Sequence, residues 1–312
     1  MTLQLKNIGM IKEANVKIDG LTVIAGENDT GKSTLGKALF LCLEAQDNKR
    51  IDIDSLYYSL FRQLRIDLKD NAFIKLKIKD NESEINNKIP FIIDIINNFS
   101  ITKNIFIETP LVWNFTDFFR DIAQVESQMR IELFYPYLMK DLNFKLHIKS
   151  ASDGLDIKKQ ITNLMGGEFK KDEMGRYYFD KKGQRIELVN TATGIKYFGL
   201  FQVLSQNKYL NEETVLILDE PEVHLHPKWQ LEMAKIIVEL VKNGVKIVVN
   251  SHSPYMIQAL IKYARDEEDI TDKSNFYLAT KEEDYATFEN VNNDLNKIFE
   301  LLAEPMNEVF EL

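Results

Sequence analysis

The 312-residue sequence contains a single cysteine, Cys42, which excludes an internal disulfide and a cysteine-based zinc cluster. Long apolar runs are also missing. No stretch approaches the roughly 18 residues of a membrane span, and an acidic residue interrupts even the run at residues 91–96. Residues 1–24 lack the basic start and cleavage site of a signal peptide. These absences predict a cytoplasmic protein with no contact with the membrane.

Positive charge is scarce as well, with 39 Lys and Arg against 48 Asp and Glu and a net charge of −9. This balance argues against a stand-alone nucleic-acid-binding protein. Residues 140–186 run the other way, with 11 basic and 7 acidic residues. They form either a modest contact patch or a solvated hairpin and helix, and the second interpretation is favoured. DNA contact stays open as an alternative.

The patterns along the chain predict an α/β fold. Residues 3–20 alternate apolar and polar positions around Gly9, which indicates an antiparallel hairpin, and residues 21–25 form a buried strand. From Gly31 to about Glu44, apolar residues recur at helical spacing and place Cys42 in the core. Strand, glycine loop and helix therefore follow in direct succession.

The later part of the chain predicts a mostly parallel sheet. Strands are expected at 215–218 and 245–250, and helices at 228–241 and 254–264, which is the rhythm of βαβ units. A hairpin is expected at 177–188 and a helix at 194–206. We expect a nucleotide-binding core at 1–45 and 186–312, with residues 46–185 as an inserted, mainly helical subdomain ending in the hairpin.

The strongest motif lies between the strand at 21–25 and the following helix. Residues 26–33 match G-x-x-x-x-G-K-S/T, the P-loop. Its glycines let backbone N–H groups turn toward phosphates, and the helix N-terminus adds a partial positive charge. Lys32 is expected to reach the β- and γ-phosphates of ATP, and Ser33 to bind Mg²⁺. The predicted nucleotide-binding residues of this segment are Asn28, Asp29, Thr30, Gly31, Lys32, Ser33 and Thr34.

Two acids follow the apolar strand at 215–218. We expect Asp219 to complete the Mg²⁺ site with Ser33, and Glu220 to act as the general base that polarises the attacking water. The less favoured alternative is a pair of solvated acids that cap a strand.

Histidines occur in two short motifs downstream. Residues 221–227 read Pro-Glu-Val-His-Leu-His-Pro, and residues 251–254 read Ser-His-Ser-Pro. His224 and His226 have the spacing of two metal ligands. A metal site there is not favoured, because no further Cys or His lies in a suitable sequence context.

The pattern D-E-P-E-x-H-L-H-P, followed by S-H-S-P, resembles one family over residues 1–45 and 186–265. The family is that of ABC-type ATPases of the structural-maintenance-of-chromosomes (SMC) and overcoming-lysogenisation-defect (OLD) group, especially short AAA-like ATPases of bacterial phage-defence operons. The resemblance implies an ABC-type ATPase head that hydrolyses ATP. It also implies that His252 is a switch histidine at the γ-phosphate.

The same resemblance implies a composite site between two protomers, and hence a homodimer or higher homo-oligomer. The signature loop that caps the partner's nucleotide aligns with residues 190–196, so Thr193 and Gly194 are expected to contact ATP. Ala192 replaces the usual serine, and His226 takes the position of the D-loop aspartate. The Q-loop glutamine could be Gln63, Gln124 or Gln128.

Longer OLD proteins carry a TOPRIM nuclease domain, and too few residues follow Pro254 for one here. The resemblance therefore implies that a separately encoded effector, a nuclease or toxin, is the partner. The main alternative is a DNA-repair or recombination ATPase head that acts directly on DNA. A transporter cassette is less favoured because the Leu-Ser-Gly-Gly-Gln signature is absent, and Glu220 argues against a module that binds ATP without hydrolysing it.

Overall fold

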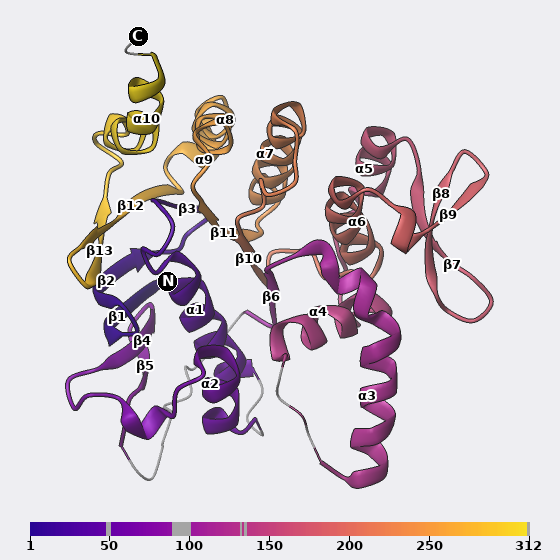
Figure 1. The fold of residues 1–312 in the computed structure, drawn as a ribbon, viewed down its shortest axis with the longest axis horizontal. Coiled ribbons are helices and arrows are strands. Elements are labelled where there is room, and N and C mark those ends of the chain that lie inside the picture. The colour runs from indigo at the N-terminus through magenta and orange to yellow at the C-terminus, as the bar shows by residue number, and fades with distance from the viewer. Residues whose placement is uncertain (48–50, 89–100, 132, 134–135, 311–312) are drawn as a thin grey trace. The chain divides into compact units, whose positions relative to one another are not determined.

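The computed structural model describes residues 1–47, 51–88, 101–131, 133 and 136–310 (Figure 1). The run at 91–96 lies outside these residues. The chain divides into two compact units: Met1–Phe106 together with Glu212–Leu312, and Ile107–Asn211. Each unit is described by itself.

The first unit is built on a ten-stranded sheet with the strand order β5-β4-β1-β2-β13-β12-β3-β11-β10-β6. Its strands are β1 (Thr2–Ile8), β2 (Ile11–Lys17), β3 (Leu21–Ala25), β4 (Phe73–Ile78), β5 (Asn81–Ile85), β6 (Lys103–Ile107), β10 (Thr214–Asp219), β11 (Lys246–Ser251), β12 (Ser274–Glu282) and β13 (Tyr285–Asn290). Strands β1 and β2 form the expected antiparallel hairpin.

The parallel part of this sheet positions the site. Strands β12, β3, β11 and β10 run parallel, and Ala25 pairs with both Ser251 and Leu278. Their carboxyl ends therefore share one edge. The predicted α/β class and parallel sheet are confirmed.

The helices of the first unit are α1 (Lys32–Asp47), α2 (Ile53–Phe61), α7 (Pro227–Lys242), α8 (Pro254–Arg265), α9 (Glu268–Thr271) and α10 (Asn296–Phe310), with a short 3-10 turn η1 (Arg65–Asp67). Helix α1 is buried on most of its surface, and Cys42 lies in the core. Helices α7 and α8 pack side by side (Figure 1). Ser253 starts α8 by accepting a hydrogen bond from the Met256 N–H, and Pro254 fits the first turn because that position needs no donor.

Residues 51–88 differ from the expected helical insertion, because β4 and β5 extend the large sheet through pairing of β4 with β1. The physical reason is burial: Ile74, Leu76 and Ile85 lie in the core of the first unit. Helix α6, expected in the core domain, belongs to the second unit. The compact units thus divide after Phe106 and Asn211 rather than after residues 45 and 185.

The second unit contains α3 (Thr116–Met129), α4 (Tyr137–His147), α5 (Lys158–Met165) and α6 (Thr193–Gln206), with 3-10 turns η2 (Pro110–Phe115) and η3 (Leu188–Asn190). Strand β7 (Glu168–Lys171) joins the expected hairpin of β8 (Tyr177–Lys181) and β9 (Gln184–Glu187) in an antiparallel sheet. Buried Trp113 stacks on Phe169 at 5.1 Å between ring centroids. A Cβ on Gly199 would lie 2.3 Å from the Phe169 ring, so this glycine lets α6 approach the sheet.

Within the described residues, no helix is both long enough and apolar enough to cross a membrane.

Candidate functional site

The candidate site lies where β3, β10 and β11 end. After β3 the chain turns through residues 26–31 and enters α1. Two glycines are required in this loop. A Cβ on Gly26 would lie 2.4 Å from the Ala279 carbonyl oxygen, and one on Gly31, whose φ is +80°, would lie 2.8 Å from the Ile11 side chain. The sequence pattern of the P-loop therefore reflects close packing as well as backbone conformation.

Lys32 is the buried cation of this loop, with 5% of the residue exposed. Its ammonium donates to the carbonyls of Gly26 (2.9 Å) and Glu27 (2.5 Å). Burial lowers the pKa of Lys32, and the nearby carboxylates of Glu220 and Asp219 oppose that effect. The loop thus holds the ammonium close to its own backbone, near Asp219 at the end of β10 and Glu220 directly after it.

The other P-loop residues differ in their exposure to solvent. Asn28 and Asp29 are exposed, and Thr30 is buried with its hydroxyl donating to the Glu27 carbonyl at 2.9 Å. Thr34 is half-buried in the first turn of α1. Their contacts with nucleotide remain predictions.

The predicted Mg²⁺ ligands lie together. The Ser33 hydroxyl donates to Asp219 Oδ1 at 3.1 Å, across 186 residues of sequence. Burial raises the pKa of Asp219, and hydrogen bonds from Asn250 and Ser33 favour its charged form. A hydroxyl and a carboxylate are oxygen donors of the kind that Mg²⁺ prefers, so the residues fit the ion.

Asn250, which sequence reasoning missed, links the two motifs. The side chain is fully buried at the end of β11. Its Nδ2 donates to Asp219 Oδ1 at 2.8 Å and to the Lys32 carbonyl at 3.1 Å. The available signal was an amide near the end of an otherwise apolar strand.

Glu220 and His252 also meet. His252 Nδ1 lies 3.2 Å from Glu220 Oε1. The Glu220 backbone has φ of +50°, and its N–H donates to the Asn250 carbonyl at 2.9 Å. A neutral imidazole has one N–H, so it can donate to Glu220 or to a phosphate but not to both. The predicted base and switch histidine therefore interact directly.

Glu222 is a second residue that sequence reasoning left without a role, although it belongs to the D-E-P-E motif. It is 4% exposed. Its Oε1 accepts hydrogen bonds from the Ser251 hydroxyl (2.7 Å) and from the N–H groups of His252 (3.0 Å) and Ser253 (3.2 Å). Burial raises the pKa of this carboxyl. Glu222 thereby fixes the turn that carries His252.

The two histidines of the motif at 221–227, His224 and His226, lie on the surface. His226 is the N-cap of α7, where Nδ1 accepts from the Lys228 N–H at 3.3 Å. His224 is exposed, with φ of +67°. Across the part of the chain that the structure describes, no group of three or more His, Cys, Asp or Glu is arranged to hold a metal ion. A nucleotide contact from His226 remains a prediction.

Thr193 and Gly194 belong to the second unit, whereas the contacts above all lie in the first. They begin α6, and Ala192 caps this helix without a side-chain hydrogen bond. The first turn is held by Lys196, whose carbonyl accepts from Trp113 Nε1 and whose ammonium donates to Asn114, both at 2.9 Å.

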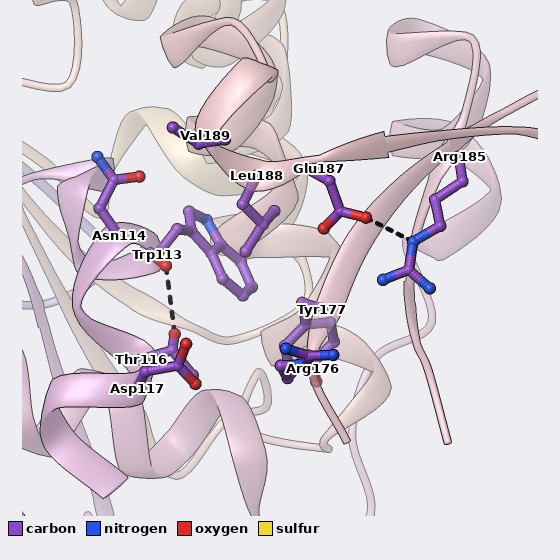
Figure 2. Close-up of a pocket in the computed structure, with 10 residues that line it drawn as sticks. All are labelled: Trp113, Asn114, Thr116, Asp117, Arg176, Tyr177, Arg185, Glu187, Leu188 and Val189. Carbon is purple, nitrogen blue, oxygen red and sulfur yellow. Dashed lines mark hydrogen bonds and ion pairs between the residues drawn. The ribbon is translucent and has the colours of Figure 1, made fainter. Parts of the chain in front are cut away.

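A pocket of about 490 Å³ adjoins this turn of α6 (Figure 2). Figure 2 shows the residues that line it: Trp113, Asn114, Thr116, Asp117, Arg176, Tyr177, Arg185, Glu187, Leu188 and Val189. Among them, Trp113 and Asn114 hydrogen-bond to Lys196 of α6, and Leu188 and Val189 belong to η3, the turn before α6.

The glycine loop, the buried lysine and the acid-histidine cluster define a P-loop head of the nucleotide-hydrolase class. Residues 44–257, more than half of the chain, match the model of a family described as an AAA ATPase domain. The chain belongs to this AAA ATPase domain family. The matched region begins after the P-loop, which therefore rests on its own residues and contacts.

Two curated proteins share segments with the chain. Septu protein PtuA of Bacillus thuringiensis is 36% identical over 52 residues, which cover 17% of this chain and 13% of that protein. The Old nuclease of Escherichia phage P2 is 27% identical over 157 residues, which cover 49% of this chain and 24% of that protein. The chain thus spans no more than about a quarter of either relative.

Solved SMC heads show the same fold. An Smc head bound to the C-winged helix domain of ScpA has a TM-score of 0.50 and 11% identity, covering 95% of this chain and 98% of that one. A head with an extended coiled coil, bound to the C-terminal domain of ScpA derived from Pyrococcus furiosus, has a TM-score of 0.50 and 12% identity, covering 98% of each chain. The expected SMC- and OLD-like head is therefore confirmed at the level of fold.

Proposed function

We propose that this chain is a cytoplasmic ATPase subunit that dimerises around Mg-ATP and uses this closure to control a separately encoded effector, a nuclease or toxin, in defence against phage. The observation that carries the proposal is the convergence of Lys32, Ser33, Asp219, Glu220 and His252 at one edge of the sheet.

Nucleotide binding is assigned to the P-loop and the start of α1. The backbone N–H groups of residues 28–34 and the N-terminus of α1 would bind the phosphates, with Lys32 at the β- and γ-phosphates. Ser33 and Asp219 would hold Mg²⁺, which would supply charge neutralisation at the β- and γ-phosphates. Asn250 orients Asp219 by hydrogen bonding to Oδ1. Such a supporting partner fixes the direction of a metal ligand.

Hydrolysis is assigned to Glu220. Its carboxylate would accept a proton from water as that water attacks the γ-phosphorus and ADP leaves. His252 holds this carboxylate through Nδ1. When ATP is present, a contact of His252 with the γ-phosphate would compete with that hydrogen bond and free Glu220 for the water. The switch role of His252 is thus an exchange of hydrogen-bond partners.

Dimerisation is assigned to the start of α6. Thr193, Gly194 and their backbone N–H groups would contact the nucleotide held by the other protomer, and His226 would lie at the D-loop position. The support is the resemblance in sequence, together with the SMC-head fold. Because Ala192 has no hydroxyl to donate, closure should be weak without an additional contact.

The role in defence rests on the similarity to Septu protein PtuA and to the Old nuclease, and on the D-E-P-E-x-H-L-H-P motif. Control of a partner is supported by the two Smc heads that bind a separate polypeptide, ScpA. A cytoplasmic location agrees with the supply of ATP there.

The proposal is tested by co-expressing the chain with its neighbouring genes during phage infection. Protection or toxicity should need a neighbouring product and should disappear in Lys32→Ala and Glu220→Gln. A matched control is Lys242→Ala, which removes one exposed lysine at the end of α7. Protection that survives both site variants would contradict the proposal.

A second candidate, a head acting directly on DNA, is favoured by one observation. Lys149, Lys159, Lys181 and Lys182 are exposed in the second unit, whereas Lys158 and Lys170 pair with Glu168. Binding of labelled duplex DNA at rising salt decides between the two candidates, since phosphate contacts weaken steeply with salt. Salt-dependent binding that is lost on replacing the four exposed lysines would favour this second candidate.

A further inference from the structure

The far end of β12 lies against the P-loop. Strand β12 runs parallel to β3, the strand that leads into the loop, with Leu278 opposite Ala25. The next residue, Ala279, lies close to Gly26. A Cβ added to Gly26 would lie 2.4 Å from the carbonyl oxygen of Ala279. Ligands of open α/β sheets bind at the carboxyl ends of parallel strands. Strand β12 therefore delivers its last residues to the nucleotide-binding edge.

Lys281 is two residues beyond Ala279, on the same face of the strand. Its ammonium forms an ion pair with Asp29, at the tip of the P-loop. The two side chains are 37% and 71% exposed, so the pair lies at the mouth of the loop.

Asp29 needs this partner for an electrostatic reason. Its φ is +59°, a left-handed conformation that Gly, Asn and Asp adopt with the least strain. Aspartate satisfies the backbone, but it adds a negative charge to a loop whose N–H groups would receive a triphosphate. An uncompensated carboxylate there would repel the ligand.

We propose that Lys281 belongs to the nucleotide-binding site, where it neutralises Asp29 and so sets the affinity of the P-loop for the phosphates of ATP. The proposal rests on the proposed binding of ATP by this loop. It adds a residue that lies outside the P-loop and outside the motif at 219–227, 249 positions beyond Lys32 in the chain.

The test is titration of the full chain with Mg²⁺ and a non-hydrolysable ATP analogue, at low and high salt. Lys281→Ala should lower affinity about threefold to tenfold at low salt, and less at high salt because exposed charges are screened. Asp29→Asn keeps the left-handed backbone and the N–H group of residue 29, and should bind more tightly than wild type because it removes a negative charge from the loop. The double variant should return close to the wild-type affinity, because both charges are gone.

Lys242→Ala is the matched control. Lys242 also pairs with an exposed acid, Glu267, but it ends α7 and so lies at the opposite edge of the parallel strands. It should bind like wild type. Unchanged affinity in Lys281→Ala would overturn the proposal, as would a double variant as weak as Lys281→Ala, which would mean that Lys281 contacts the nucleotide directly. Lys32→Ala distinguishes a failure of the Lys281 proposal from a failure of the proposed ATP site. If Lys32→Ala also binds the analogue normally, the nucleotide site itself is wrongly assigned.

Discussion

Replacing Glu222 by alanine should loosen the turn at residues 251–253, which carries His252. The substitution removes the oxygen that accepts from the Ser251 hydroxyl and from the N–H groups of His252 and Ser253. The Ser253 N–H keeps a second acceptor, the Ser251 hydroxyl oxygen at 3.1 Å. Two donors, the buried Ser251 hydroxyl and the partly buried His252 N–H, therefore lose their partner. At roughly 1–3 kcal/mol each, the turn should be destabilised by about 2–6 kcal/mol.

Glu222→Gln is the control, because its side-chain oxygen can still accept from the same donors. Burial raises the pKa of Glu222, so the folded wild type binds a proton more strongly than the unfolded chain. The stability from this group is full below the unfolded pKa and is lost as pH rises through the folded pKa. Since glutamine does not titrate, the stability of Glu222→Gln relative to wild type should increase with pH.

Hydrogen exchange of peptides containing His252, together with ATP turnover, measures both effects. In Glu222→Ala, exchange at His252 and Ser253 should accelerate and kcat should fall. Nucleotide affinity should change little, because the contacts of Lys32 and Ser33 are untouched. In Glu222→Gln, protection and turnover should stay near wild type. Equal protection and turnover in the alanine variant, or equal damage by glutamine and alanine, would refute this role of Glu222.

Three further substitutions test neighbouring parts of the site. Asn250→Ala removes both hydrogen bonds that orient Asp219 and the start of α1, and should weaken Mg²⁺-dependent ATP binding about 10- to 100-fold, as seen by titration with the metal. Lys32→Ala should abolish ATP binding in a folded protein, as checked by nucleotide titration and circular dichroism. Ala192→Ser should raise ATP-dependent dimerisation or turnover, measured by light scattering and phosphate release, and a clear loss of both would mean that residues 190–196 are misaligned with the signature loop.

The parts of the site that could be predicted are those in which neighbouring residues share one task. The P-loop, the acids after β10 and the turn after β11 each occupy a short segment at the end of a buried strand. Apolar runs such as 215–218 and 247–249 identify those strands from sequence. Each of these motifs, and the strand that it follows, could therefore be predicted from the sequence.

The parts that could not be predicted depend on contacts between distant segments. Asn250 bonds across 218 residues to Lys32, and Lys281 pairs across 252 residues with Asp29. A single sequence gives no sign of either pairing. The segment at 51–88 was misleading for a related reason: β4 and β5 alternate buried positions with Lys and Glu, and only pairing with β1 reveals them as part of the main sheet.

The central claim is that this loop and acid pair bind and hydrolyse ATP, with Glu220 as the base. It is tested most directly by measuring ATP binding and single-turnover hydrolysis in wild type and Glu220→Gln. The variant should bind ATP with near wild-type affinity and hydrolyse it at least about 100-fold more slowly, because an amide cannot accept the proton of the attacking water. Hydrolysis by Glu220→Gln at the wild-type rate would contradict the account.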